Sequence, residues 1–138
     1  MAEMSLKKRI INVERLGHVA VRVKDIERAK SFYINLGMKL VWDDPEWCYL
    51  EAQHSGDGLA LLGPKYKAAG PHFAFHFTKK SEVEKAHRDL KEAGCHVGSL
   101  HDHRDGTSSF YLKDPEGNWL EMLYLPLEGI PSNTDIKE

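Results

Sequence analysis

The chain has 138 residues, of which 41% are hydrophobic, and this is enough for one globular domain with its own core. Its 19 basic and 21 acidic residues give a net charge of -2 without a long run of either sign, which excludes the basic stripe of a nucleic-acid-binding protein. No stretch approaches the roughly 20 apolar residues of a membrane span, and residues 1–12 lack the apolar core of a signal peptide, so we expect a cytoplasmic protein without a membrane partner.

The first predicted module spans about residues 13–63. Residues 16–23 alternate between polar or small and bulky apolar side chains, a pattern that predicts a strand. Asp25 is the expected N-cap of the helix that follows, and Gly37 suits the left-handed position at which such a helix ends. Three short strands are then expected at residues 38–42, 47–53 and 58–62.

The second predicted module spans about residues 70–125. It opens with a strand at 72–78, and Ser81 with Glu84 forms a capping box that begins a helix. Gly94 is the expected end of this helix. Three further strands are expected at residues 95–100, 108–112 and 119–125.

The two modules repeat the same order of elements: one strand, one helix and three strands. One such unit cannot close its own sheet, whereas two can curl their strands around a shared cavity and cover the outside with helices. The sequence therefore predicts a single-domain α+β fold in which two βαβββ modules form a curled mixed sheet around a central cavity. A polar tail at residues 126–138 is expected to be a loose arm.

Each module opens with a histidine in the same slot of its first strand. His18 begins the run His-Val-Ala-Val, and His72 begins the run His-Phe-Ala-Phe. Glu121 is the one charged residue of an otherwise apolar final strand, where an unpaired carboxylate is costly to bury. Two imidazoles and one carboxylate are the ligand set of an open divalent-metal site. A strand histidine is more often an ordinary core or surface residue, but the repeat favours a metal site made by these three residues.

These residues carry a resemblance to the vicinal oxygen chelate superfamily, which includes glyoxalase I, extradiol dioxygenases, fosfomycin-resistance proteins and methylmalonyl-CoA epimerase. The similar segments are residues 16–21, 29–38, 71–74 and 110–121. The resemblance implies a small-molecule substrate that binds the metal through two adjacent oxygens, with His18, His72 and Glu121 as ligands. It also implies a homodimer with sites shared between the chains. Fe(II) or Mn(II) is the expected ion, with Zn(II) or Ni(II) as alternatives.

Several further site residues follow from the resemblance. Glyoxalase I has a fourth ligand, a glutamate, where this chain has Leu61 or a neighbour, so the chain resembles the three-ligand enzymes more closely. Tyr111 matches a tyrosine that contacts the substrate ten residues before the glutamate ligand. His101 or His103 matches a histidine that hydrogen-bonds the substrate or transfers protons, and Glu51 lies where epoxide-hydrating fosfomycin relatives have a general base. An ordinary solvated side chain is the alternative for each of these four.

The leading functional hypothesis is a metal-dependent enzyme that resembles an extradiol dioxygenase and acts on a small oxygen-bearing substrate. One alternative uses the same metal without redox change, as a glyoxalase-like lyase or isomerase or as a fosfomycin-type transferase or hydrolase. Another alternative is a metal-free binding protein of the bleomycin-resistance kind.

Overall fold

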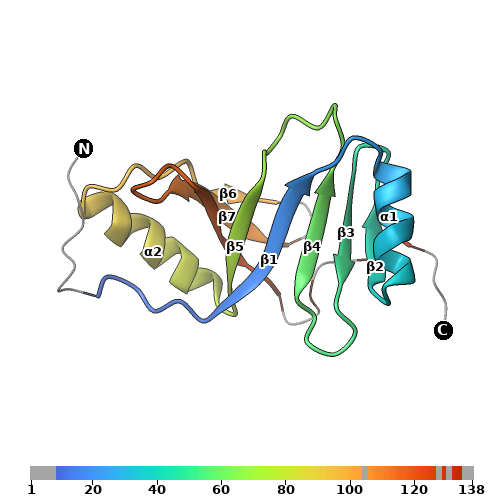
Figure 1. Ribbon diagram of the computed structural model, residues 1–138. Coiled ribbons are helices and arrows are strands. Elements are labelled where there is room, and N and C mark those ends of the chain that lie inside the picture. Colours follow the sequence, from blue (N-terminus) through green and yellow to red (C-terminus); the bar gives the residue numbers. More distant parts are fainter. Residues whose placement is uncertain (1–8, 104–105, 127–128, 130–131, 135–138) are drawn as a thin grey trace. The chain divides into compact units, whose positions relative to one another are not determined.

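The structure is a computed structural model, and it describes residues 9–103, 106–126, 129 and 132–134. One strand, one helix and three strands follow one another twice along the chain (Figure 1). The first set is β1 Arg15–Arg22, α1 Ile26–Asn35, β2 Lys39–Asp43, β3 Trp47–Glu51 and β4 Gly58–Leu62. The second set is β5 His72–Phe77, α2 Lys80–Glu92, β6 His101–Asp102, β7 Ser108–Lys113 and β8 Trp119–Tyr124. The predicted α+β fold of two βαβββ modules is confirmed.

The described residues divide into two compact units. The first unit contains residues 17–73 together with 132–134, and the second contains residues 9–16, 74–126 and 129. Within the first unit the strand order is β2-β3-β4-β1; β1 and β4 are parallel, and the other pairs are antiparallel. Within the second unit the order is β5-β8-β7-β6, and β7 is antiparallel to both of its neighbours. Each unit therefore has an open four-stranded sheet and one helix.

Helix α1 begins and ends where the sequence predicts. The Asp25 carboxylate accepts a hydrogen bond of 3.1 Å from the Arg28 backbone N–H, and Gly37 ends the helix at a φ of 104°. Apolar residues of α1 pack on one face of the first unit's sheet. The buried residues of this cluster are Cys48, Leu50 and Leu61, and the partly buried residues from the helix are Ile26, Ala29 and Tyr33. Helix α1 therefore covers this face of the first unit's sheet, and the other face is not covered by α1.

The predicted start of helix α2 is wrong by two residues. The N-cap is Lys79, which makes no side-chain capping bond, so Ser81 lies inside the first turn. Only two residues separate the end of β5 from Lys80, and the ammonium of Lys80 lies 3.1 Å from the carboxylate of Asp102. The first turn of α2, which begins two residues earlier than predicted, therefore contains an ion pair that the Ser81–Glu84 pattern does not predict. Gly94 ends the helix at a φ of 93°, as predicted.

The predicted strand at residues 95–100 is also wrong. Val97 forms one isolated bridge with Leu112, and the edge strand is instead β6, which pairs with β7. The Gly98 N–H donates a 2.7 Å hydrogen bond to the Tyr111 carbonyl, and a Cβ on Gly98 would lie 3.2 Å from that oxygen. The segment therefore meets β7 through one bridge and one hydrogen bond rather than through a continuous ladder, and the missing side chain of Gly98 eases this close approach.

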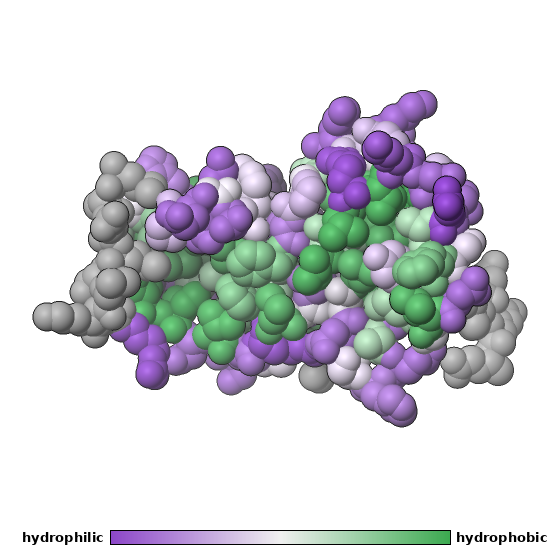
Figure 2. Space-filling view, viewed as in Figure 1, coloured by the Kyte–Doolittle hydropathy of each residue, from purple (hydrophilic) through white to green (hydrophobic). Residues whose placement is uncertain are grey.

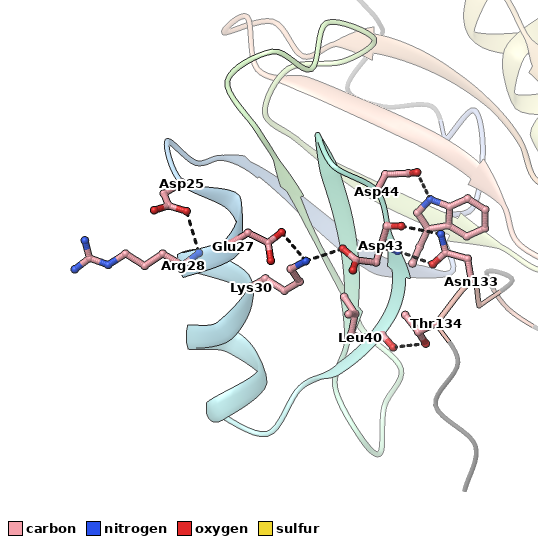
Figure 3. A network of polar contacts seen from close by, with 10 residues as sticks. Asp25, Glu27, Arg28, Lys30, Leu40, Asp43, Asp44, Asn133 and Thr134 are labelled. Carbon is pink, nitrogen blue, oxygen red and sulfur yellow. Dashed lines mark hydrogen bonds and ion pairs between the residues drawn. The ribbon is translucent and has the colours of Figure 1, made fainter.

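Part of the predicted loose tail is bound to the edge of β2 (Figure 3). The Asn133 side chain accepts a 2.6 Å hydrogen bond from the Asp43 N–H and donates one of 2.8 Å to the Asp43 carbonyl. The Asn133 N–H donates to the Val41 carbonyl, and the Thr134 hydroxyl donates to the Leu40 carbonyl. These bonds cover backbone groups of an edge strand, which would otherwise be open to other chains. Residues 127–128, 130–131 and 135–138 of the tail lie outside the described residues.

Lys30 connects α1 with β2 through two ion pairs (Figure 3). Its ammonium lies 2.8 Å from the carboxylates of both Glu27 and Asp43. Burial by itself lowers the pKa of Lys30, but the hydrogen bonds to Asp43 and Glu27 outweigh it and raise that pKa above the ordinary value of 10.5. The folded state therefore favours the charged form of Lys30.

We expect Lys30→Met to lower the free energy of unfolding by about 1 kcal/mol at pH 7, because Asp43 loses its cation while remaining partly solvated. A raised pKa in the folded state contributes stability below pH 10.5 and loses it as the pH rises further. The difference from the wild type should therefore shrink above pH 10.5, as measured by urea unfolding from pH 7 to 11. Lys24→Met is the control at an exposed lysine, and an equal loss there would contradict the prediction.

Large apolar side chains remain exposed at α1 and just after it. They include Phe32, Ile34 and Leu36, and the space-filling view shows apolar surface interspersed with polar surface (Figure 2). Exposed apolar residues of this kind are common in folded proteins. Among the described residues, no helix combines the length and the apolar character that crossing a membrane would require.

Candidate metal centre

The two predicted histidine ligands meet within the first unit. The Nε2 atoms of His18 and His72 lie 3.4 Å apart, and the two rings are nearly perpendicular, at 76°. His18 is 7% exposed, and His72 is half-buried. The repeat thus brings together side chains that are 54 positions apart in the sequence.

The proton position on His72 is fixed by its neighbour. Its Nδ1 lies 2.8 Å from the Gly70 carbonyl, and a carbonyl can only accept, so Nδ1–H is the donor. In the neutral ring Nε2 then has an unprotonated lone pair that points toward His18. A backbone carbonyl on the far nitrogen is the usual way in which proteins orient a metal-binding imidazole.

The separation of the two nitrogens fits one bound cation. Bonds between a metal and an imidazole nitrogen are about 2.0–2.1 Å long, so one ion can reach two nitrogens up to about 4.2 Å apart. The observed 3.4 Å lies inside this limit. Without a cation, the two rings can share one proton between the nitrogens, and a metal ion would displace that proton.

Other polar residues share the sheet face of His18. In the parallel pairing of β1 with β4, His18 lies opposite Gly58, and in the antiparallel pairing of β3 with β4, Gly58 lies opposite Glu51. Glu51 therefore lies in the same cross-strand row as His18, two strands away. Tyr49 lies on this face as well, with its ring 5.6 Å from that of His18 at 78°. The predicted base thus lies on the side of the sheet that carries the histidine pair.

The resemblance assigns the fourth ligand slot of glyoxalase I to Leu61 or a neighbour, and these residues lie on both faces of β4. Leu61 is fully buried on the opposite face, in the cluster that packs against α1. The residues of β4 that share the face of His18 are Gly58, Ala60 and Leu62, because side chains alternate along a strand. None of these three side chains can ligate a metal, and the absence of a fourth ligand stays a prediction.

The predicted carboxylate lies in the second unit. Glu121 is 6% exposed on β8 and pairs directly with Tyr111 of β7, so both side chains are on one face of that sheet. The alternate face carries apolar residues that pack toward α2, including Phe110 and Met122. Glu121 is therefore a buried acid on the polar side of its sheet, with the predicted tyrosine beside it.

The two candidate histidines of the second unit differ in their environment. The Nε2 of His103 lies 2.8 Å from the hydroxyl of Ser109, which is fully buried and lies on the same face as Tyr111. His101 lies on edge strand β6 opposite Ser109, and it is exposed. Both histidines are exposed, and His103 differs from His101 in its hydrogen bond to the buried Ser109 hydroxyl.

The acid between these histidines is part of an ion pair. The ammonium of Lys80 and the hydroxyl of Ser108, which donates a 2.9 Å hydrogen bond, lower the pKa of Asp102 below its ordinary value. Asp102 therefore stays ionised near neutral pH and anchors β6 to α2. This contact gives the histidine-bearing segment a fixed attachment within its unit.

Sequence reasoning did not predict the contacts of Tyr49 with His18 and of Ser109 with His103. Tyr49 alternates with Glu51 along β3, but its closeness to His18 depends on the parallel pairing of β1 with β4. Ser109 alternates with Tyr111, and its bond to His103 depends on where the chain turns back into β7. Side-chain alternation was thus the available signal for both, but the strand register was needed to use it.

Comparison with known proteins identifies the family. Residues 15–122 match the Glyoxalase/Bleomycin resistance protein/Dioxygenase superfamily, and the chain belongs to this superfamily. It is 25% identical over 118 residues to biphenyl-2,3-diol 1,2-dioxygenase 3 of Rhodococcus globerulus. This similarity covers 78% of the chain and 62% of the relative, so the chain spans less than two thirds of the relative's length.

Solved structures share the fold. The substrate complex of homoprotocatechuate 2,3-dioxygenase from Brevibacterium fuscum matches with a TM-score of 0.70 at 19% identity, over 91% of this chain and 39% of that one. The 2,2',3-trihydroxybiphenyl 1,2-dioxygenase from Sphingomonas wittichii strain RW1 matches with a TM-score of 0.61 at 26% identity, over 88% and 44%. Methylmalonyl-CoA epimerase from Mycobacterium tuberculosis matches with a TM-score of 0.64 at 19% identity, over 79% and 86%. Proteins named as dioxygenases and as an epimerase therefore share this fold.

Proposed function

We propose that His18, His72 and Glu121 bind one divalent cation and that the chain is a metal-dependent enzyme of the extradiol-dioxygenase kind. The observation that carries this proposal is the facing pair of imidazole nitrogens, 3.4 Å apart, with the far side of His72 bound to a backbone carbonyl. A buried carboxylate such as Glu121 is costly unless a cation or hydrogen bonds compensate its charge. Similarity to two dioxygenases at 25% and 26% identity supports the reaction class.

Fe(II) or Mn(II) is the proposed ion, and Zn(II) or Ni(II) would suit the same three ligands. Two imidazoles and one carboxylate on one side of an ion are typical of non-haem iron oxygenases. When bound, such an ion acts as a Lewis acid and offers open positions to two adjacent substrate oxygens and to O2.

The remaining predicted residues are proposed to bind the substrate and move its protons. Tyr111 of β7 pairs with Glu121 of β8, so its hydroxyl is suited to contact a substrate held near that carboxylate. His103 is proposed to hydrogen-bond the substrate or pass protons to and from it, and its bond to Ser109 orients the ring. His101 is proposed as the exposed alternative for this role.

A second candidate function is a lyase or isomerase that uses the same cation without redox change. The position of Glu51 in the row of His18 favours it, because a carboxylate on the ligand-bearing face is a suitable general base. The epimerase among the structural relatives is consistent with this candidate. Glu51→Gln would abolish base catalysis in this case and would leave ring cleavage largely intact.

Metal reconstitution with an oxygen electrode distinguishes these functions. Protein loaded separately with Fe(II), Mn(II) and Zn(II) is mixed with catechol, 2,3-dihydroxybiphenyl or 3,4-dihydroxyphenylacetate. We expect stoichiometric O2 uptake and a coloured ring-cleavage product with Fe(II) or Mn(II), and none with Zn(II), because only the first two ions can exchange electrons with O2. Bound metal without O2 uptake for any diol would favour the lyase or isomerase. A metal-free chain of normal stability would favour the bleomycin-resistance kind of binding protein.

We also propose that two copies associate as a homodimer and that each site takes residues from both chains. Light scattering should then give a mass of about twice the 15.7 kDa of one chain. A cytoplasmic location stays a prediction.

A further inference from the structure

A glycine on β4 makes room for a tyrosine hydroxyl beside the histidine pair. Gly58 is the direct neighbour of His18 in the parallel pairing of β1 with β4. A Cβ on Gly58 would lie 1.9 Å from the hydroxyl oxygen of Tyr49 and 2.3 Å from its Cζ. Real contacts of a Cβ are never this short, so the tyrosine occupies the volume that any other residue at position 58 would fill.

The Tyr49 ring leans along the sheet toward His18. In the register of β3 with β4, Tyr49 pairs with Ala60, but its hydroxyl lies over Gly58, two residues away along β4. The tilt carries the hydroxyl from the row of Ala60 into the row of His18. The ring centroids of Tyr49 and His18 are 5.6 Å apart, in an edge arrangement.

We propose that the Tyr49 hydroxyl takes the place of a β4 side chain in the metal centre and donates a hydrogen bond to the oxygen ligand that binds there. No residue of β4 on this face can ligate a metal, and Gly58 leaves the position beside His18 without any side chain. The phenol is 2% exposed, and a tyrosine hydroxyl donates a hydrogen bond without burying a charge. The chemical class of ligand is a small molecule with two adjacent oxygens, and this inference rests on the metal site proposed above.

The neutral donor selects among ligands. A hydroxyl that is aimed into a buried site stabilises a ligand with an acceptor oxygen at that point, and it rejects one with an apolar group there. Tyr49 would therefore favour vicinal diols and keto acids over monophenols of the same size. Because the hydroxyl adds no negative charge, it would also leave the net charge of the ligand set unchanged.

The test uses the full chain loaded anaerobically with Fe(II) and titrated with 4-nitrocatechol, whose visible spectrum changes on binding. The Fe(II) affinity is measured separately by competition with a chelator. We expect Tyr49→Phe to weaken 4-nitrocatechol binding about tenfold, as is typical for one lost hydrogen bond in a buried site, and to change the Fe(II) affinity less than threefold. Tyr33→Phe removes the same atom from helix α1, on the other side of the sheet, and should change neither affinity.

Gly58→Ala provides a second, independent variant. Its methyl group should displace the Tyr49 hydroxyl and weaken 4-nitrocatechol binding to a similar extent. Combining it with Tyr49→Phe should weaken binding no more than twofold beyond the stronger single change, because both remove the same hydrogen bond.

Three outcomes would overturn the inference. Unchanged 4-nitrocatechol affinity in Tyr49→Phe would show that the hydroxyl has no role toward the ligand, while the metal site itself would stand. A tenfold loss of Fe(II) affinity with unchanged 4-nitrocatechol binding would mean that the hydroxyl acts on a metal ligand instead. A wild-type chain that binds no Fe(II) would refute the proposed metal site and this inference together.

Discussion

We expect His72→Ala to lower the affinity for divalent metal at least 100-fold while leaving the metal-free protein folded. The change removes one of the two imidazole nitrogens that face each other, a larger loss than the 10–100-fold caused by changing a group that only supports a ligand. His72 is half-buried, so its removal should change the free energy of unfolding by less than about 1 kcal/mol. Elemental analysis and isothermal titration with Mn(II) or Zn(II) measure the first effect.

Thermal unfolding gives a second measure of the same site. A ligand present at 100 times its Kd stabilises a folded protein by about 2.7 kcal/mol, so the metal should raise the Tm of the wild type by several degrees. At the same metal concentration the Tm of His72→Ala should hardly move. His54→Ala removes an exposed histidine from a turn in the same unit and should behave as the wild type. Full metal occupancy in His72→Ala would refute the ligand assignment.

Local sequence patterns predicted most of the elements, because the signals that define them are local. Asp25 begins helix α1 through a hydrogen bond accepted from the Arg28 N–H three residues away, and Gly37 ends the helix through its own positive φ. The predictions are wrong where contacts with a segment distant in the sequence determine the secondary structure. The segment at residues 95–100 meets β7 only at Val97 and Gly98 instead of forming the expected strand. The ion pair with Asp102 accompanies the early start of α2 at Lys80.

The part of the candidate site that could be predicted from the sequence is the part supplied by equivalent positions of the two modules. His18 and His72 occupy the same slot of two similar strands, so their meeting followed from the duplication. The duplication does not predict the position of Tyr49, because its closeness to His18 depends on the register of β4 and on the missing side chain of Gly58. The hydrogen bond from His72 to the Gly70 carbonyl likewise depends on how the linker turns into β5.

Glu121→Gln should weaken metal binding while leaving the metal-free protein folded. The amide keeps the shape of the side chain but removes the negative charge that attracts a cation, so the metal affinity should fall about 100-fold. The metal-free protein should stay folded, with its free energy of unfolding changed by about 1 kcal/mol or less, because the amide fills the same volume at a position that is 6% exposed. Glu116→Gln, at an exposed turn, should alter neither quantity. Reduced stability together with unchanged metal affinity would assign Glu121 a structural role only.

Mixing the two defective variants shows which chain supplies the carboxylate. His72→Ala retains Glu121, and Glu121→Gln retains both histidines, so neither variant alone should bind metal tightly. If each site takes its histidines from one chain and its carboxylate from the second copy, a mixed dimer regains one intact site of its two. Unfolding and refolding an equimolar mixture should then restore tight metal binding to about a quarter of the sites, because half of the dimers are mixed. If all three ligands come from one chain, no mixing ratio restores any, because each chain lacks a ligand of its own.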